Sequence, residues 1–219
     1  MAQVGERRRY PRRPIQLPLL FRSKGPSAVT AGVGWTQNLC QGGALVELAE
    51  HLPPPTPVSL LLQTGEGPIG VEEQVVWTRQ VVPLGGVLHA VTFTQHLPDP
   101  IQDLLLSQSK AGNPRLRLAT DLDVTCEPKG AGRGSLQGRA ADAGRGGLLL
   151  YLPEALFPGT AVDLRLHISD APILAEGVIV WADPPEGRAP GALIRHGVRF
   201  TSIGLTALLS LGLFLVEPR

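Results

Sequence analysis

Aromatic residues, cysteine and net charge are all scarce in this chain of 219 residues. Phe, Trp and Tyr together make up 5% of it, there are two cysteines, and the formal net charge is +1. Cys40 and Cys126 stand far apart and have no histidine at ligand spacing, so the sequence indicates neither a zinc site nor a disulfide framework. Such cysteine usage is typical of a reducing cytoplasm, where we expect the protein to be located.

Long apolar segments are missing as well. Residues 203–216 form the longest apolar run, which is too short to cross about 30 Å of hydrocarbon as a helix. No apolar segment follows the charged N-terminus. We therefore expect neither a transmembrane helix nor a signal peptide. The run could cover a core or a partner, and core cover is the preferred interpretation.

What the sequence does contain is an internal repeat. Residues 38–77 align with residues 142–181 at a constant offset of 104, and sixteen of the forty positions are identical. Unrelated segments would share roughly a twentieth to a tenth of their positions. Beyond a three-residue insertion, residues 91–94 match residues 198–201. The chain is therefore a duplication, and we predict two domains, residues 1–112 and 113–219, each large enough for one small core.

Glycine and proline indicate the fold class. There are 26 Gly and 21 Pro, scattered between short apolar runs, which favours short strands over long helices. The pattern predicts a glycine turn that feeds a strand within residues 38–48. It predicts further strands at residues 15–22, 58–63, 70–78 and 88–94, and again at 118–126, 147–152, 161–167, 173–181 and 197–201. Helices are predicted from Asp99 and over residues 205–216. Five or six antiparallel strands per copy suggest an all-β fold of two small closed barrels, each followed by a short helix.

Several other features have simple structural interpretations. The five histidines stand singly, with no carboxylate or serine at motif spacing, so we assign them to the surface or to turns. Trp77 and Trp181 occupy equivalent positions on apolar strands, which favours core packing over base stacking. Residues 130–147 are rich in glycine and arginine but lack the spacing of a phosphate-binding loop, so a mobile loop is expected. No catalytic constellation and no metal site is evident.

An arginine arm is present in the first copy only. Five arginines crowd into residues 7–13, whereas at the same offset Arg8 and Arg12 correspond to Gly112 and Leu116. Guanidinium groups grip phosphate oxygens bidentately, pair with the acceptor edge of guanine and stack on bases. Exposed arginine-rich termini are also commonly solvated tails or weak nucleic-acid patches. Tyr10 is expected to pin the arm to the barrel rather than to touch a ligand.

A turn predicted at residues 38–43 is the second element that differs. Asn38 offers a donor and an acceptor, and Gly42 and Gly43 let backbone N–H groups approach an anion closely. The second copy keeps both glycines but has Asp142 and Gly144 in place of Asn38 and Cys40. We therefore expect ligand binding in the first copy and not in the second.

The order Arg8-x-x-x-Arg12, then Asn38-x-Cys40-x-x-Gly43, then strands containing Trp77 and Phe93 resembles the PilZ family. The resemblance covers both copies. It implies six-stranded barrels with trailing helices, and it implies a cyclic di-GMP site. The two arginines would contact phosphates and guanine, and the Asn38–Gly43 segment would cradle the other side of the ligand. With neighbouring residues included, the predicted ligand-binding set is Arg7, Arg8, Arg9, Arg12, Asn38, Cys40, Gly42 and Gly43.

Two departures from the family pattern matter. Cys40 stands where the family usually has serine, and a thiol is the weaker hydrogen-bond donor, so the native site is expected to be sub-optimal. The other possibility is that Cys40 is a small buried hydrophobe that never meets ligand. The second copy lacks the RxxxR pair altogether, since Arg115 and Arg117 have the wrong spacing.

The leading hypothesis is a non-enzymatic cytoplasmic receptor that binds cyclic di-GMP in its first barrel and signals to a protein partner through contacts of the second. The alternative is a pair of degenerate barrels that act as a protein-interaction adaptor, with the arginines binding an acidic partner. Generic nucleic-acid binding would need the arm but not Asn38 and is disfavoured. Arg7 could favour an intercalated ligand dimer, so the sequence leaves one or two ligands per site open, together with the oligomeric state.

Overall fold

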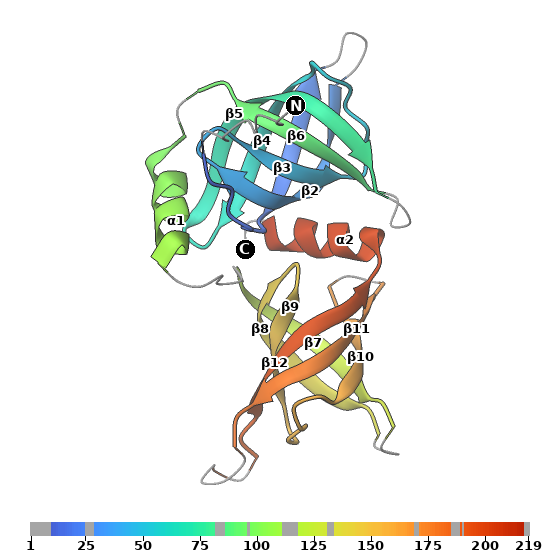
Figure 1. Ribbon diagram of the computed structural model, residues 1–219. Coiled ribbons are helices and arrows are strands. Elements are labelled where there is room, and N and C mark those ends of the chain that lie inside the picture. Colours follow the sequence, from blue (N-terminus) through green and yellow to red (C-terminus); the bar gives the residue numbers. More distant parts are fainter. Residues whose placement is uncertain are drawn as a thin grey trace, which may run out of the picture.

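The computed structural model of the protein describes residues 10–24, 29–81, 86–95, 97–110, 118–130, 134–168, 171–184, 189 and 191–216. Two barrels lie one above the other in Figure 1, with a helix between them. Each barrel is built from one copy of the repeat.

The first barrel is closed and antiparallel throughout. Its strands follow the order β1-β2-β3-β6-β5-β4, and β4 pairs with β1 to complete the ring. A trailing helix, α1, stands beside this barrel in Figure 1 and buries Ile101 and Leu105 in its core. The elements are β1 (Pro18–Lys24), β2 (Val29–Cys40), β3 (Gly43–Leu48), β4 (Pro57–Thr64), β5 (Gly67–Gln80), β6 (Val87–Phe93) and α1 (Asp99–Lys110).

The second barrel has the same topology, with β7 closing the ring on β10. The prediction of two six-stranded antiparallel barrels, each followed by a helix, is therefore confirmed. Its elements are β7 (Leu118–Pro128), β8 (Leu136–Gly144), β9 (Gly147–Leu152), β10 (Ala161–Leu166), β11 (Ile173–Ala182), β12 (Ile194–Ile203) and α2 (Leu205–Val216).

Aliphatic side chains that alternate along the strands fill both barrels. In β4, Val58, Leu60 and Leu62 point inward and are at most 2% exposed, and their counterparts in β10 are equally buried. Side chains at every second position share one face of a strand. Each such residue contributes about 1.5 to 3 kcal/mol through burial. Aliphatic side chains are therefore sufficient to fill both cores, although the chain contains few aromatic residues.

Sequence analysis did not predict the second strand of each copy, which is β2 in the first barrel and β8 in the second. β2 begins at Val29 and β8 occupies residues 136–144, so the expectation of a mobile loop over residues 130–147 is wrong for this part. Two equivalent glycines of these strands, Gly34 and Gly138, are required by packing. A Cβ at Gly34 would lie 2.6 Å from the carbonyl oxygen of Glu47, and one at the equivalent Gly138 would overlap the carbonyl oxygen of Tyr151. Glycine in a strand often marks such a close approach of a neighbouring backbone.

Two histidines are core residues, which corrects their assignment to surface or turns. His89 and His196 are equivalent in the repeat and both are fully buried. In each, Nε2 accepts a hydrogen bond from a backbone N–H, of Leu52 at 3.1 Å and of Leu156 at 3.0 Å. The Nδ1 atoms lie 3.0 and 2.9 Å from the carbonyl oxygens of the residues two positions earlier. Because Nε2 must be an acceptor, the neutral ring carries its proton on Nδ1 and ties two segments together.

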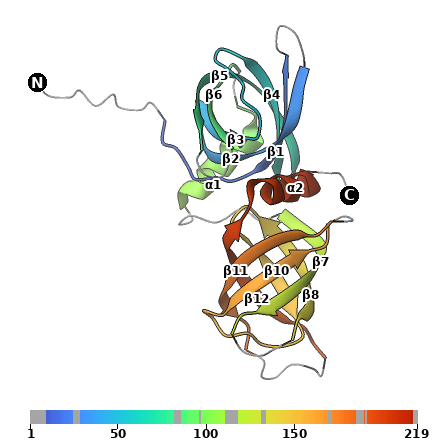
Figure 2. The ribbon, with the colours of Figure 1, turned by 90° about the vertical axis from the view of Figure 1, so that its right-hand side faces the viewer.

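Helix α2 links the two barrels. The apolar run at residues 205–216 is the predicted helix, and Leu208, Leu211 and Leu215 join the core of the second barrel. Its other side contacts the first barrel, where Trp35 Nε1 donates a hydrogen bond to the Leu208 carbonyl at 2.9 Å. Figure 2 shows the same placement from the side. Within the described residues, no helix is both long and apolar enough to cross a membrane.

Candidate functional site

Residues 10–17, which we call the N-terminal strap, run along the end of β2. Arg13 and Leu39 exchange backbone hydrogen bonds of 2.8 and 2.9 Å. Further along, the Thr36 hydroxyl donates to the Ile15 carbonyl at 2.6 Å and accepts from the Leu17 N–H at 2.8 Å. These contacts hold the strap beside the β2–β3 hairpin. They place exposed Arg12 next to the hairpin turn.

The hairpin turn is shorter than the sequence suggested. Asn38 and Cys40 lie within β2, and only Gln41 and Gly42 form the turn, so the prediction of a turn over residues 38–43 is wrong for its first part. The Gly42 carbonyl accepts hydrogen bonds from the Phe93 N–H at 3.2 Å and the Thr92 hydroxyl at 3.1 Å. The turn is therefore fastened to β6.

Gly43 is required by backbone packing. A Cβ there would overlap the carbonyl oxygen of Val91 and lie 3.1 Å from its carbonyl carbon. The same holds for Gly147 against Val198 in the second barrel. Because both copies need this glycine, its presence alone says nothing about ligand binding.

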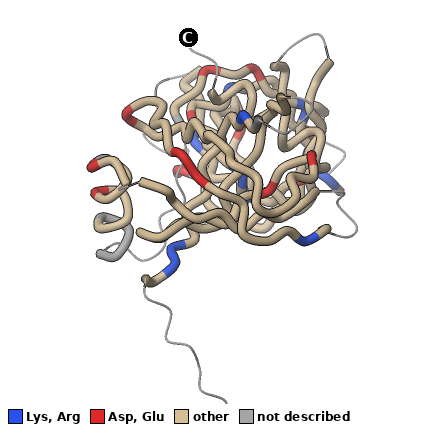
Figure 3. The backbone as a smooth tube through the Cα atoms, turned by 90° about the horizontal axis from the view of Figure 1, so that it is seen from above, with Lys and Arg blue, Asp and Glu red and all other residues tan. Residues whose placement is uncertain are grey.

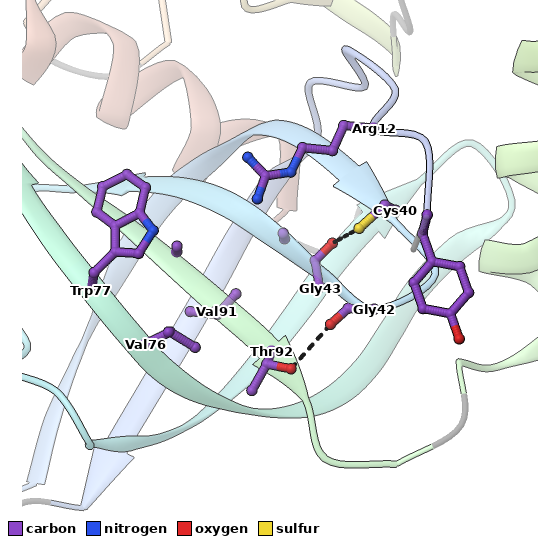
Figure 4. Close-up of a pocket in the computed structure, with 11 residues that line it drawn as sticks. Arg12, Cys40, Gly42, Gly43, Val76, Trp77, Val91 and Thr92 are labelled. Carbon is purple, nitrogen blue, oxygen red and sulfur yellow. Dashed lines mark hydrogen bonds between the residues drawn. The ribbon is translucent and has the colours of Figure 1, made fainter. Parts of the chain in front are cut away.

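A pocket of 310 Å³ opens over this hairpin on the outer surface of the first barrel. Figure 4 shows the Arg12 guanidinium pointing across it toward the indole of Trp77. Backbone and small side chains of β3, β5 and β6 form its floor. It is lined by Tyr10, Arg12, Cys40, Gly42, Gly43, Ala44, Val76, Trp77, Ala90, Val91 and Thr92.

The pocket is electropositive. Of the described residues that line it, Arg12 alone is charged. Arg12 and Arg13 are the first basic residues that the structure describes, and Figure 3 shows a basic stretch of the tube where the described chain begins. No group of three or more His, Cys, Asp or Glu side chains in the described part of the chain is placed to hold a metal ion. This arrangement suits a planar, anionic organic ligand better than a metal.

Cys40 lies half-buried in the pocket wall. Its Sγ donates a long hydrogen bond of 3.3 Å to the carbonyl oxygen of Gly43 (Figure 4). The thiol is therefore neither a deeply buried hydrophobe nor a free donor. It is already engaged with the hairpin on which a ligand would rest.

Four of the eight predicted site residues meet in this pocket: Arg12, Cys40, Gly42 and Gly43. Asn38 is half-buried in β2 and is not part of the lining. Arg7, Arg8 and Arg9 lie outside the described residues. Tyr10 packs its ring on Gly42, where a Cβ would come within 3.0 Å of it, and thus pins the strap as expected while also lining the pocket.

Trp77 is the main functional candidate that sequence analysis missed. It is 39% exposed and Trp181 is 43% exposed, so the assignment of both to the core is wrong. Alternation from buried Val75 would turn Trp77 inward, but the register shifts between these two residues. Such a bulge adds one residue and sends the following side chains to the other face. The same shift precedes Trp181. Nothing in the local sequence signalled it.

The fold and the pocket together define a tandem small-barrel protein with a pocket on the outer surface of its first barrel. The profile of the PilZ domain matches residues 6–108 and residues 110–216. The chain therefore belongs to the PilZ domain family, with two copies of the domain.

Solved structures with a similar fold include three bacterial proteins. The Bacillus subtilis inhibitor of motility MotI/DgrA is 12% identical with a TM-score of 0.39, over 92% of this chain and 95% of that one. Borreliella burgdorferi PlzA, solved in complex with c-di-GMP, is 12% identical with a TM-score of 0.44, over 91% and 88%. Escherichia coli YcgR, also solved with c-di-GMP, is 13% identical with a TM-score of 0.35, over 90% and 82%. A comparison with curated protein sequences finds no match.

Proposed function

We propose that this protein is a receptor for cyclic di-GMP, rather than an enzyme, and that it binds the dinucleotide in the pocket of its first barrel. The observation that supports the proposal most strongly is the pocket itself. It brings a guanidinium, an exposed indole and a glycine turn together on one barrel, and the residues concerned come from the strap, β2, β3, β5 and β6.

The chemistry of the ligand matches that of the lining. Cyclic di-GMP carries two phosphodiesters and two guanines, and Arg12 can grip a phosphate or pair with the O6 and N7 acceptors of guanine. The face of Trp77 offers a stacking surface for a purine, a contact of about 1 to 3 kcal/mol. Arg7, Arg8 and Arg9, which lie outside the described residues, remain proposed ligand contacts.

Calorimetry of the purified protein with cyclic di-GMP tests the proposal. Cyclic di-AMP is the matched ligand control, because it keeps both phosphates and replaces the guanine acceptor edge. We expect binding of the first and much weaker binding of the second. The measured stoichiometry distinguishes one ligand per site from an intercalated pair.

Variants locate the site. Arg12→Ala removes a charge-assisted contact of about 1.5 to 3 kcal/mol and should weaken binding at least tenfold. Arg8→Ala combined with Arg12→Ala should abolish measurable binding. Arg139→Ala is the control, since Arg139 is an exposed arginine of the second barrel that pairs with Asp121. If no cyclic di-GMP binds at tens of micromolar, the protein-interaction adaptor becomes the better hypothesis.

We also propose that a protein partner reads the bound state through the second barrel. A bound dinucleotide would order the arginine arm over the pocket, and such ordering of a segment is a common switching device. Slower hydrogen exchange of the strap on ligand addition is the expected result. Unchanged exchange despite tight binding would contradict this output mechanism without affecting the binding proposal.

A further inference from the structure

Each barrel carries a row of three side chains on its outer surface, and the two rows differ by one methyl group. In the first barrel Trp77 of β5 lies opposite Ala90 of β6, which in turn lies opposite Leu45 of β3. In the second barrel the corresponding row consists of Trp181, Gly197 and Leu149. The tryptophan and the leucine are retained, and only the middle residue changes.

In the second barrel the indole of Trp181 lies directly on Gly197. A Cβ at Gly197 would overlap Nε1 and would lie only 2.5 Å from Cε2 and 2.6 Å from Cδ1 of the ring. Gly197 is buried although it stands on the outer surface, because the indole covers it. No side chain, however small, can share this position with the ring.

In the first barrel the methyl of Ala90 occupies that volume. The indole of Trp77 is therefore unable to take the place that Trp181 takes. Instead, Ala90 and Trp77 both border the 310 Å³ pocket, with Val76 and Val91 beside them (Figure 4). The two indoles are similarly exposed, at 39% and 43%, so the difference is one of position and not of burial.

We propose that Ala90 is a positioning residue of the ligand site, which keeps the pocket open by denying Trp77 the position seen for Trp181. In the second barrel the indole of Trp181 takes that position on Gly197. The consequence for affinity rests on the proposed function, whereas the position of the indole does not. Removing the methyl would let Trp77 settle on β6, and a ligand would then bind only the fraction of molecules in which the indole has moved away.

The position of the indole can be tested without ligand by NMR spectroscopy of the full chain. In the wild type, the Hα resonances of Gly197 should be shifted upfield by the ring current of Trp181. In Ala90→Gly, the new glycine should acquire a comparable upfield shift as Trp77 settles on it. In Gly197→Ala, the Nε1–H resonance of Trp181 should move while that of Trp77 stays. An unshifted glycine in Ala90→Gly would overturn the proposal.

The second arm measures ligand affinity by calorimetry. Ala90→Gly should bind cyclic di-GMP about tenfold more weakly, the effect of a site that is open one tenth of the time. Ala90→Ser keeps the Cβ and should bind within about threefold of wild type, while Gly197→Ala should leave affinity unchanged. Unaltered affinity of Ala90→Gly, with its glycine shifted upfield, would show that the ligand does not need the open position. If the wild type binds no cyclic di-GMP, the proposed function fails and the NMR result still decides the position of Trp77.

Discussion

The same hairpin turn serves two different purposes in the two barrels. In the first, Gly42 lines a pocket together with Arg12 and Tyr10 of the strap, and Gln41 is exposed. In the second, the equivalent turn carries Arg145, whose Nη2 lies 2.5 Å from Oε2 of Glu47 on the first barrel. The ion pair is largely buried, with 15% of the Arg145 side chain and 3% of the Glu47 side chain exposed. Gln37 Nε2 donates to the same carboxylate oxygen at 2.6 Å.

The two copies of the turn therefore differ in their surroundings, because the first borders a pocket and the second joins the two barrels. The second turn kept the glycines that its backbone packing needs, and an arginine at the exposed Gln41 position became an anchor between the barrels. Glu47 lies on β3, the strand that begins at the pocket with Gly43. The two turns are therefore connected through one strand and one buried ion pair.

The largest expected effect comes from breaking that ion pair. Among the described residues, Arg145→Ala leaves the buried Glu47 carboxylate with Gln37 as its hydrogen-bond partner. We therefore expect the free energy of unfolding to fall by about 3 kcal/mol or more. Gln41→Ala, at the matching exposed position of the first turn, should change it little. Urea denaturation measures both. Equal effects of the two changes would contradict the division of roles between the turns.

A double variant sharpens this test. Arg145→Met combined with Glu47→Leu replaces both charges with apolar groups and should recover most of the loss, because the penalty arises from an unpaired buried charge. Ligand affinity should remain unchanged in Arg145→Ala, since Arg145 does not line the pocket of the first barrel.

Acid should lower the free energy of unfolding, because each barrel contains an equivalent buried histidine. Burial lowers the pKa of His89 from 6.5 to about 4, and protonation would convert the Nε2 acceptor of the Leu52 N–H into a donor. A depressed histidine pKa contributes stability that is present above pH 6.5 and is lost as the pH falls toward 4. Over this range the free energy of unfolding should fall by about 3 kcal/mol. Urea unfolding between pH 7 and pH 4 should show it, and His89→Gln should flatten the curve. An unaltered pH profile in that variant would count against His89.

The first barrel has a buried carboxyl group, that of Glu73 on β5, which the described residues of the second barrel lack. Glu73 is 2% exposed, and neither carboxyl oxygen has a hydrogen-bond partner among the described residues, whereas the second barrel has Gly177 at this position. Burial, aided by the nearby charge of Glu72, raises the pKa of Glu73 well above 4.5. Below pH 4.5 both the folded and unfolded states are protonated, and stability falls as the pH rises above this value because the unfolded chain ionises first.

Replacing Glu73 should therefore stabilise the first barrel. Glu73→Met removes an unsatisfied buried group, and we expect a gain of about 1 to 3 kcal/mol at pH 7, measured by denaturation. Glu73→Gln should remove the pH dependence while retaining a buried polar group. Glu66→Gln is the control, because Glu66 is exposed in the turn between β4 and β5. A loss of stability in Glu73→Met would show that the carboxyl has a partner in solution.

The smallest expected effect concerns Cys40, which the second barrel replaces with Gly144. The thiol donates to the Gly43 carbonyl in this structure. If a ligand phosphate replaces that carbonyl as the acceptor, a hydroxyl would donate a shorter and stronger hydrogen bond than a thiol, so Cys40→Ser should tighten cyclic di-GMP binding by about tenfold. Cys126→Ala, in the core of the second barrel, should leave affinity unchanged. Calorimetry of the two variants beside wild type decides the point, and unchanged or weaker binding by Cys40→Ser would show that the thiol does not stand in for a serine.

The sequence alone determined the architecture of this protein. The constant offset between the copies established the duplication, and the short apolar runs between glycine and proline predicted strands and closed barrels. The trailing helices followed from a capping residue at Asp99 and from the apolar run at residues 205–216. These signals are local, or they compare one segment with another, and neither kind depends on how distant strands pair. The sequence also placed Arg12 and Cys40 in one predicted site, and both line the same pocket.

Only the tertiary structure decided which way several side chains point. Trp77 faces the pocket because a bulge interrupts the alternation of β5, and a bulge depends on pairing with β6. His89 is buried because its ring bonds to a segment 37 residues away. Arg145 became an anchor because α2 brings the second barrel against Glu47. Each outcome depends on strand register or on the approach of remote segments, and a single residue's identity specifies neither.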